Sequence, residues 1–165
     1  PEAFDVLDKA LERLPNNPEL LYDHAMAAER IDRLPVMESS LRKLISIKPD
    51  HAHAYNALGY TLADRNQRLE EAQALIGQAL KLSPDDAFIM DSMGWVQYRM
   101  GNLAAAEASL RQAYALRNDV EIAVHLGEVL WALGERDEAR RIWKEALQAS
   151  PENDTLQKTL KRFSP

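Results

Sequence analysis

The side chains that could do chemistry in this sequence are carboxylates and four histidines, since the chain contains no cysteine. His51 and His53 are two residues apart, a spacing that points their rings to different faces of a helix, so we expect no metal site there. Glu70 and Glu71 lie on a predicted exposed helix face, without an apolar pocket that could raise a carboxyl pKa. No glycine-rich phosphate loop, HExxH or G-x-S-x-G motif occurs. We therefore predict that the protein is not an enzyme and uses no cofactor.

The composition argues against several further functions. A net charge of −6 makes nucleic acid an improbable partner, because phosphate binding requires clustered Lys and Arg. No apolar run approaches the roughly 20 residues of a membrane-spanning helix. The lack of cysteine removes disulfides and zinc–thiolate sites. The chain begins with Pro1 rather than Met, so we expect a piece of a longer protein whose targeting information lies elsewhere.

Two helical patterns in residues 85–118 indicate how the polar and aromatic side chains are positioned. The first places four residues on one stripe at spacings of three and four, namely Met90, Met93, Gly94 and Gln97. After the turn Gly101-Asn102-Leu103, the second places Ala106, Leu110 and Ala113 on an equivalent stripe. The small residues Gly94 and Ala106 occur where two helices would touch. The pattern predicts a helical hairpin with a tight crossing, which must be repeated because it cannot cover its own apolar faces.

The same landmarks recur along the chain at a spacing of about 34 residues. The recurring positions are Gly59, Gly94 and Gly127; Ala72, Ala106 and Ala139; Ala79, Ala113 and Ala146; and Pro15, Pro49, Pro84 and Pro151, with Asn118 in the missing proline position. This pattern resembles the tetratricopeptide repeat, a helix pair with Leu-Gly, Tyr, Ala, Phe and Pro at fixed positions. The Tyr position has lost its aromatic side chain and holds Ala28, Leu62, Gln97 and Leu130. The resemblance implies an all-α fold, a right-handed superhelical α-solenoid.

We expect the array to divide at the recurring turn positions. The predicted units are the second helix of a truncated repeat in 1–15, full repeats in 16–49, 50–84, 85–118 and 119–151, and a capping helix with its tail in 152–165. The predicted apolar stripe of the first unit is Ala3, Leu7, Ala10, Leu11 and Leu14, and that of the cap is Leu156, Leu160 and Phe163. His24 stands where later repeats carry Leu or Met, and we interpret it as a half-buried packing residue rather than a ligand.

In the tetratricopeptide family the first helix of each pair lines a concave groove, and the resemblance carries this role onto named positions of this chain. The implied partner-binding residues are Tyr22, Met26, Arg30, Asn56, Tyr60, Asp64, Asp91, Trp95, Tyr98, Arg99, His125, Glu128 and Trp131. Large aromatic rings on a rigid concave wall are typical of protein-binding hot spots, although Trp95 and Trp131 could instead be core residues. Acids outnumber bases here, which favours a neutral or basic partner unless the charges only solvate a helix face.

We predict a protein–protein interaction module that holds a peptide or helix of a partner protein in this groove. One alternative is the substrate-presenting arm of a larger enzyme or of a protease–adaptor complex, and another is self-association through the groove or the N-terminal end. A known variant of the family clamps the terminal carboxylate of its partner. We do not expect that ligand, because Asn56 lies one position from the required site and the required lysines are absent.

A finer resemblance concerns three phrases of the sequence. LGYTLADR, DSMGWVQYRMGNL and HLGEVLWALGERDEA resemble the C-terminal repeats of long proteobacterial outer-membrane lipoproteins that act as adaptors for a carboxyl-terminal processing protease. That resemblance implies a periplasmic adaptor whose lipid anchor lies outside these residues, and it favours the cell envelope over the cytoplasm.

Overall fold

The computed structural model describes residues 1–164, and these form ten α-helices and no strand. In chain order the helices are α1 (Glu2–Arg13), α2 (Pro18–Arg30), α3 (Leu34–Ile47), α4 (Ala52–Asp64), α5 (Leu69–Leu82), α6 (Ala87–Arg99), α7 (Leu103–Leu116), α8 (Val120–Ala132), α9 (Arg136–Ala149) and α10 (Asp154–Phe163). The predicted all-α solenoid is confirmed. No helix within the described range is both long and apolar enough to cross a lipid bilayer.

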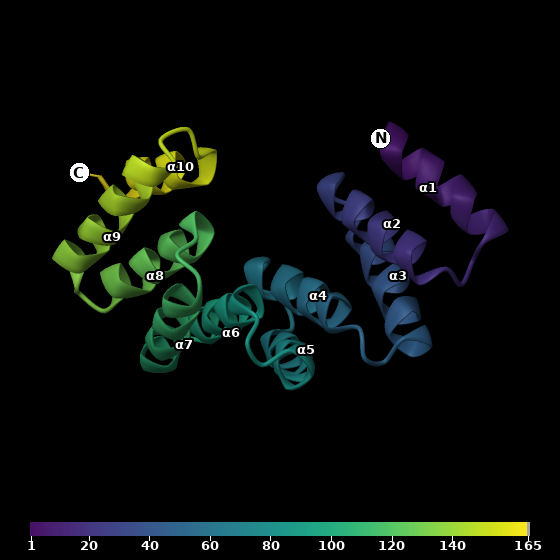
Figure 1. The fold of residues 1–165 in the computed structure, drawn as a ribbon, viewed down its shortest axis with the longest axis horizontal. Coiled ribbons are helices and arrows are strands. Elements are labelled where there is room, and N and C mark those ends of the chain that lie inside the picture. The colour runs from purple at the N-terminus through teal and green to yellow at the C-terminus, as the bar shows by residue number, and fades with distance from the viewer. Residues whose placement is uncertain (165) are drawn as a thin grey trace.

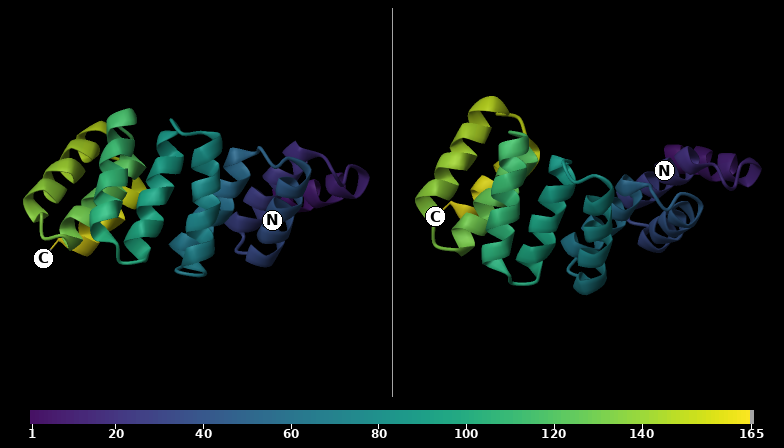
Figure 2. Two further views of the ribbon diagram at one scale, coloured as in Figure 1. Left: turned by 90° about the horizontal axis from the view of Figure 1, so that it is seen from below. Right: turned by 60° about the horizontal axis from the view of Figure 1, so that its bottom comes forward.

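The helices stack along an arc, with α1 and α10 at its two ends (Figure 1). The helices α2 to α9 form four consecutive hairpins, and each hairpin also packs on the next. Figure 2 shows the same hairpins packed side by side along the arc. In Figure 1, α4 and α8 lie on the inner side of the arc, and α5 and α9 lie on the outer side. The first helix of each pair therefore supplies the inner wall.

Each of these first helices begins with a side chain that caps its backbone. In α2, α6, α8 and α10, first-turn N–H groups donate hydrogen bonds to the side chains of Asn17, Asp86, Asp119 and Asn153, respectively. In α4, the ring of His51 accepts the equivalent hydrogen bond. The second helices α3, α5, α7 and α9 have no side-chain cap. A cap of this kind contributes about 1 kcal/mol. The inner helices thus begin at well-defined residues, and His51 has a structural role at one of those starts.

The first helices of the four hairpins also end alike. The second residue after each helix has a positive φ, and these residues are Asp32, Asn66, Gly101 and Gly134. The N–H group of the next residue donates to a carbonyl five residues back, and the accepting residues are Ala28, Leu62, Gln97 and Leu130. This closure satisfies carbonyls that a helix end leaves free. The acceptors occupy the family's Tyr position, so the local turn survives the loss of the aromatic side chain.

In three of the four repeats the two helices cross closely at a glycine. A Cβ atom added to Gly59 would lie 2.7 Å from Ile76 Cγ1, and one added to Gly94 would lie 2.5 Å from Leu110 Cγ. At Gly127 it would overlap the indole ring of Trp143. The alanines opposite, Ala72, Ala106 and Ala139, are fully buried. These contacts confirm the tight crossing that the sequence predicts, and they leave no room for a larger residue.

Helix α1 differs from its predicted packing. Phe4, which the expected stripe omits, is its buried residue and stacks on the ring of His24 at 4.7 Å. Ala3 is exposed, and Leu14 lies beyond the last helical residue with 56% of its surface exposed. The stripe was wrong at these positions, although its other two leucines do pack against the core. It was phased from later repeats, whereas α1 contacts mainly α2.

His24 is also more deeply enclosed than expected. Only 5% of the residue is exposed, and its ring contacts the Ser40 hydroxyl at 2.8 Å and the Asp8 carboxylate at 3.2 Å.

The turn of the third repeat is one residue shorter at its end than the predicted turn Gly101-Asn102-Leu103, because Leu103 already belongs to α7.

The glycine contacts generate a stability prediction. Gly127→Ala is expected to lower the free energy of unfolding by about 1–3 kcal/mol, because the rigid, buried indole of Trp143 cannot move away. Gly77→Ala is the matched control within a helix, since its Cβ would meet only Met93 Cε at 4.0 Å. For Gly77→Ala we expect the free energy of unfolding to rise by about 0.5–1 kcal/mol, because alanine lowers the conformational entropy of the unfolded chain. Urea unfolding followed by circular dichroism measures both, and equal effects would contradict the crossing.

Candidate functional site

Two adjoining pockets follow the inner wall, and we call them together the groove. The C-terminal pocket has a volume of about 830 Å³ and is lined from α4, α6, α8 and α10. The N-terminal pocket has a volume of about 540 Å³ and is lined mainly from α2, α4 and α6. Tyr60, Asp64 and Glu121 belong to both, so the two pockets join at these residues. The groove runs across consecutive repeats rather than within one of them.

Most of the sequence-predicted groove residues lie in these walls. The C-terminal pocket contains Tyr60, Asp64, Trp95, Tyr98, Arg99, His125 and Glu128, and the N-terminal pocket adds Met26, Asn56 and Asp91. Neither pocket includes Tyr22, Arg30 or Trp131. Tyr22 stacks on His51 at 5.5 Å, and Arg30 is an exposed residue at the end of α2. The geometry thus brings ten of the predicted residues together, and their role in binding stays a prediction.

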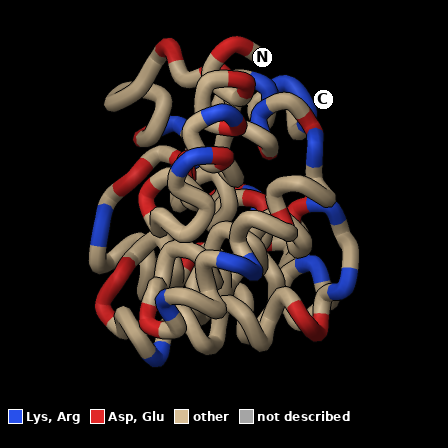
Figure 3. Tube along the Cα trace, turned by 90° about the vertical axis from the view of Figure 1, so that its right-hand side faces the viewer, with Lys and Arg blue, Asp and Glu red and all other residues tan. Residues whose placement is uncertain are grey.

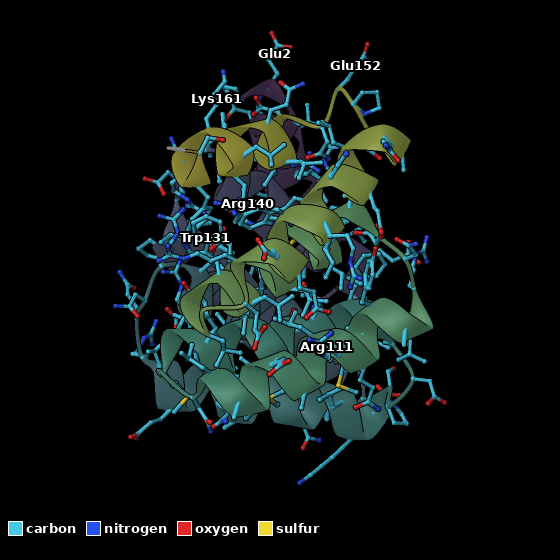
Figure 4. The ribbon with its side chains drawn as sticks, turned by 90° about the vertical axis from the view of Figure 1, so that its left-hand side faces the viewer. Glu2, Arg111, Trp131, Arg140, Glu152 and Lys161 are labelled. Carbon is cyan, nitrogen blue, oxygen red and sulfur yellow. The ribbon has the colours of Figure 1, made fainter. Side chains whose placement is uncertain are left out.

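Trp131 belongs to the packing of the C-terminal end. Its ring lies 5.9 Å from that of Trp143 and 5.3 Å from that of Phe163. Arg140 lies over the Trp131 ring at 5.1–5.2 Å together with Arg136, and Figure 4 shows Trp131 and Arg140 close to each other. Of the two interpretations given above, the structure therefore favours a packing residue at the contact between the last repeat and α10.

Trp95 lines the groove but is not the open aromatic surface that we expected. Only 5% of the residue is exposed. Its indole N–H donates to Asp64 Oδ1 at 3.1 Å, the His125 ring stacks on it at 4.2 Å, and the Arg99 guanidinium lies 4.9 Å from its ring centre. Because its polar atom and its ring are already engaged, Trp95 forms the floor of the C-terminal pocket.

A buried ion pair joins two neighbouring inner helices in this floor. His125 Nδ1 of α8 lies 2.9 Å and 3.0 Å from the two carboxylate oxygens of Asp91 on α6. The side chains are only 12% and 8% exposed. Burial by itself would lower the pKa of His125, but the charge and hydrogen bond of Asp91, with Glu128 and Asp64 nearby, outweigh it and raise that pKa. When it is protonated, His125 ties α6 to α8 through this ion pair.

Helix α10 supplies part of the groove that sequence analysis treated only as a cap. Its lining residues are Thr155, Lys158, Thr159, Arg162 and Phe163. Arg162 pairs with Glu128 of α8, which is only 8% exposed. A signal for this role was present in the sequence, because Arg162 follows Glu128 by 34 residues, the same separation as Asp91 and His125. Helix α10 is thus placed like another first helix of the array.

Tyr60 stands where the two pockets meet. Burial raises the pKa of its phenol, and the carboxylates of Asp64, Asp91 and Glu121 raise it further. The hydroxyl therefore stays protonated near neutral pH and can donate a hydrogen bond. No group of three or more His, Asp or Glu side chains in residues 1–164 has the arrangement of a metal site. The groove presents aromatic rings, hydrogen-bonding groups and carboxylates to a ligand.

Fold and groove together define the class of protein, a helical-repeat scaffold for protein interactions. Two tetratricopeptide repeat models match residues 52–86 and 92–154. The chain belongs to the tetratricopeptide repeat (TPR) family.

Several proteins that resemble the chain are described as TPR proteins. TPR repeat-containing protein PA4667 of Pseudomonas aeruginosa is 50% identical over 99% of this chain, which spans only 28% of that relative's length. Among solved structures, the thermophilic TPR protein TTC0263 of Thermus thermophilus matches with a TM-score of 0.86 and 26% identity, over 96% of this chain and 87% of that one. YrrB, described as a TPR protein with an unusual peptide-binding site, matches with a TM-score of 0.69 and 19% identity, over 97% and 84%.

The His125–Asp91 pair generates a pH prediction. A pKa raised in the folded state adds stability that is fully present below the ordinary pKa of about 6.5 and is lost as the pH rises through the folded value. We therefore expect the free energy of unfolding of the wild type to fall more between about pH 6 and about pH 9 than that of His125→Gln. Urea titrations across this range test the difference. If the free energy of unfolding changed with pH in the same way for both proteins, the His125–Asp91 pair would not cause the pH dependence.

Proposed function

We propose that the groove binds an extended segment of a partner protein. The observation that carries this proposal is the continuity of the two pockets across α2, α4, α6, α8 and α10, joined at Tyr60, Asp64 and Glu121. A surface of this length suits a stretch of polypeptide better than a compact small molecule. Its mixture of aromatic rings, such as Tyr98, with hydrogen-bonding side chains is the kind that carries binding energy at protein interfaces.

Preorganisation of the walls supports the same proposal. Cross-repeat contacts hold several groove side chains before any ligand arrives, including the Trp95–Asp64 hydrogen bond and the Asp91–His125 ion pair. A side chain that is already fixed loses little conformational entropy when it binds, so more of the contact energy appears as affinity. The description of YrrB as having a peptide-binding site shows that a protein of this fold can take such a ligand, although its identity to this chain is low.

A finer role follows from the resemblance noted in the sequence. We propose that these repeats form part of a periplasmic adaptor, in which the groove holds a protein substrate for a processing protease. The long relative supports the wider idea that such repeats can belong to a larger protein, since the chain matches 28% of it. An adaptor and a substrate-presenting arm of an enzyme would use the same groove, so one groove experiment addresses both.

Site-directed crosslinking tests the groove directly, because the chain has no cysteine of its own. A photoactivatable crosslinker on Thr155→Cys places the reactive group in the exposed wall of the C-terminal pocket. The matched control is Gln112→Cys, which is exposed on the second helix α7. With an extract of Pseudomonas aeruginosa, we expect discrete crosslinked proteins from Thr155→Cys, several-fold stronger than from Gln112→Cys and removed by excess unlabelled chain.

Two other outcomes would change the proposal. Identical band patterns from both positions would contradict binding in the groove. A product joining two copies of the chain at Thr155→Cys, with no other partner, would replace it with self-association.

A further inference from the structure

We infer that the N-terminal pocket, between α2, α4 and α6, is a subsite for a cationic Lys or Arg side chain of the bound polypeptide. The inference rests on the proposed function, because it specifies the chemistry of the partner that the groove holds. It is carried by two features of the pocket: an excess of carboxylates, two of them without an ion-pair partner among the described residues, and walls suited to the stem of a long cationic side chain.

The acids of this pocket are less neutralised than those of its neighbour. Glu29 and Glu121 line it, and neither forms an ion pair with any residue in the described range. Asp64 keeps half of its side-chain surface exposed and lies 3.7 Å from Arg99. The one base in the lining, among the residues described, is Arg65, which pairs at 2.8 Å with Asp32. The pocket therefore has an excess of negative charge that a partner cation would balance.

The hydrogen-bonding chemistry of the wall decides the sign of the ligand. Ammonium and guanidinium groups are pure donors, and the carboxylate oxygens of the wall are acceptors. A carboxylate on the ligand would instead meet the like charge of these acids.

The remaining walls fit the apolar part of the same side chain. Met26 and the ring of Tyr60 are half-buried, and Met37 below them is 1% exposed. Methylene stems of Lys and Arg pack on apolar and aromatic surface while the charged end reaches polar groups. The volume of about 540 Å³ accepts such a chain, and the carboxylates are too dispersed to form a metal site in the part of the chain described.

The other half of the groove lacks this preference, which makes the inference local. There α10 contributes Lys158 and Arg162, and Arg162 neutralises Glu128. Elsewhere on the molecule acidic and basic residues are interspersed along the trace (Figure 3). A basic residue of the partner is therefore directed to the N-terminal pocket rather than to the surface in general.

The test uses the chain of 165 residues and three bead-bound peptide libraries. Each library is randomised at all positions except the centre, which is arginine, its neutral analogue citrulline, or glutamate, and the randomised positions exclude Lys and Arg. Glu29→Gln with Glu121→Gln removes two charges from the pocket while keeping side-chain size. The matched control, Glu70→Gln with Glu145→Gln, removes two charges from exposed positions of α5 and α9.

We expect the arginine beads to capture about tenfold more wild-type protein than the citrulline beads, and the glutamate beads to capture least. The control variant should show the same preference. The pocket variant should lose most of that preference, with an unchanged circular dichroism spectrum. Glu121→Gln alone should lose part of it, which keeps the test valid if the double variant unfolds.

Each remaining outcome overturns a specific statement. Equal retention of the arginine and citrulline libraries by the wild type would refute the cation subsite while leaving the groove function intact. Loss of the preference in the control variant would assign it to the overall charge of the protein and refute the subsite as well. Failure of the wild type to retain any library would overturn the proposed peptide binding, and the subsite with it.

Discussion

The structure depends on one steric constraint, the close crossing of the two helices in each repeat. At Gly59, Gly94 and Gly127 the first helix touches the second so closely that even one methyl group would collide with it. Because three successive hairpins cross at the same position, they present their inner helices in the same orientation. Residues one repeat apart then come to lie next to each other along the inner wall. A continuous groove is the consequence of this repeated contact.

The groove floor shows what this alignment makes available. Asp91 and His125, and likewise Glu128 and Arg162, are each 34 residues apart in sequence and in contact in space. The Asp91–His125 pair is buried, and a buried ion pair is costly to desolvate, so it is weak evidence for stability. The two pairs do fix the orientation of neighbouring repeats and of the Trp95 ring between them. We therefore regard the polar floor as a means of holding the binding surface in one shape, with the less neutralised acids left at the N-terminal pocket.

Much of the fold could be predicted because its determinants are local and repeated. Small residues mark the crossings, and Asn17, Asp86, Asp119 and Asn153 cap the starts of inner helices. The misses occurred where repetition ends. Phe4 was overlooked because α1 has no equivalent neighbour on its outer side, and α10 was assigned to capping although it also lines the C-terminal pocket. Periodicity describes interior repeats well and terminal elements poorly, since their surroundings differ.

The sequence by itself determined the helix pairs, their spacing and the tight crossings, because these follow from residue size and period. The inner-wall positions came from the family resemblance, and ten of the thirteen lie in the groove walls. Only the tertiary structure decided how each of those positions is used. Trp95 and Tyr98 are both aromatic residues of α6, yet the first is buried beneath His125 while the second stays partly open. Likewise Asp91 and Glu121 are both acids of the inner wall, but only Asp91 meets a basic partner among the described residues. Such differences arise from contacts between repeats, which a pattern within one helix does not contain.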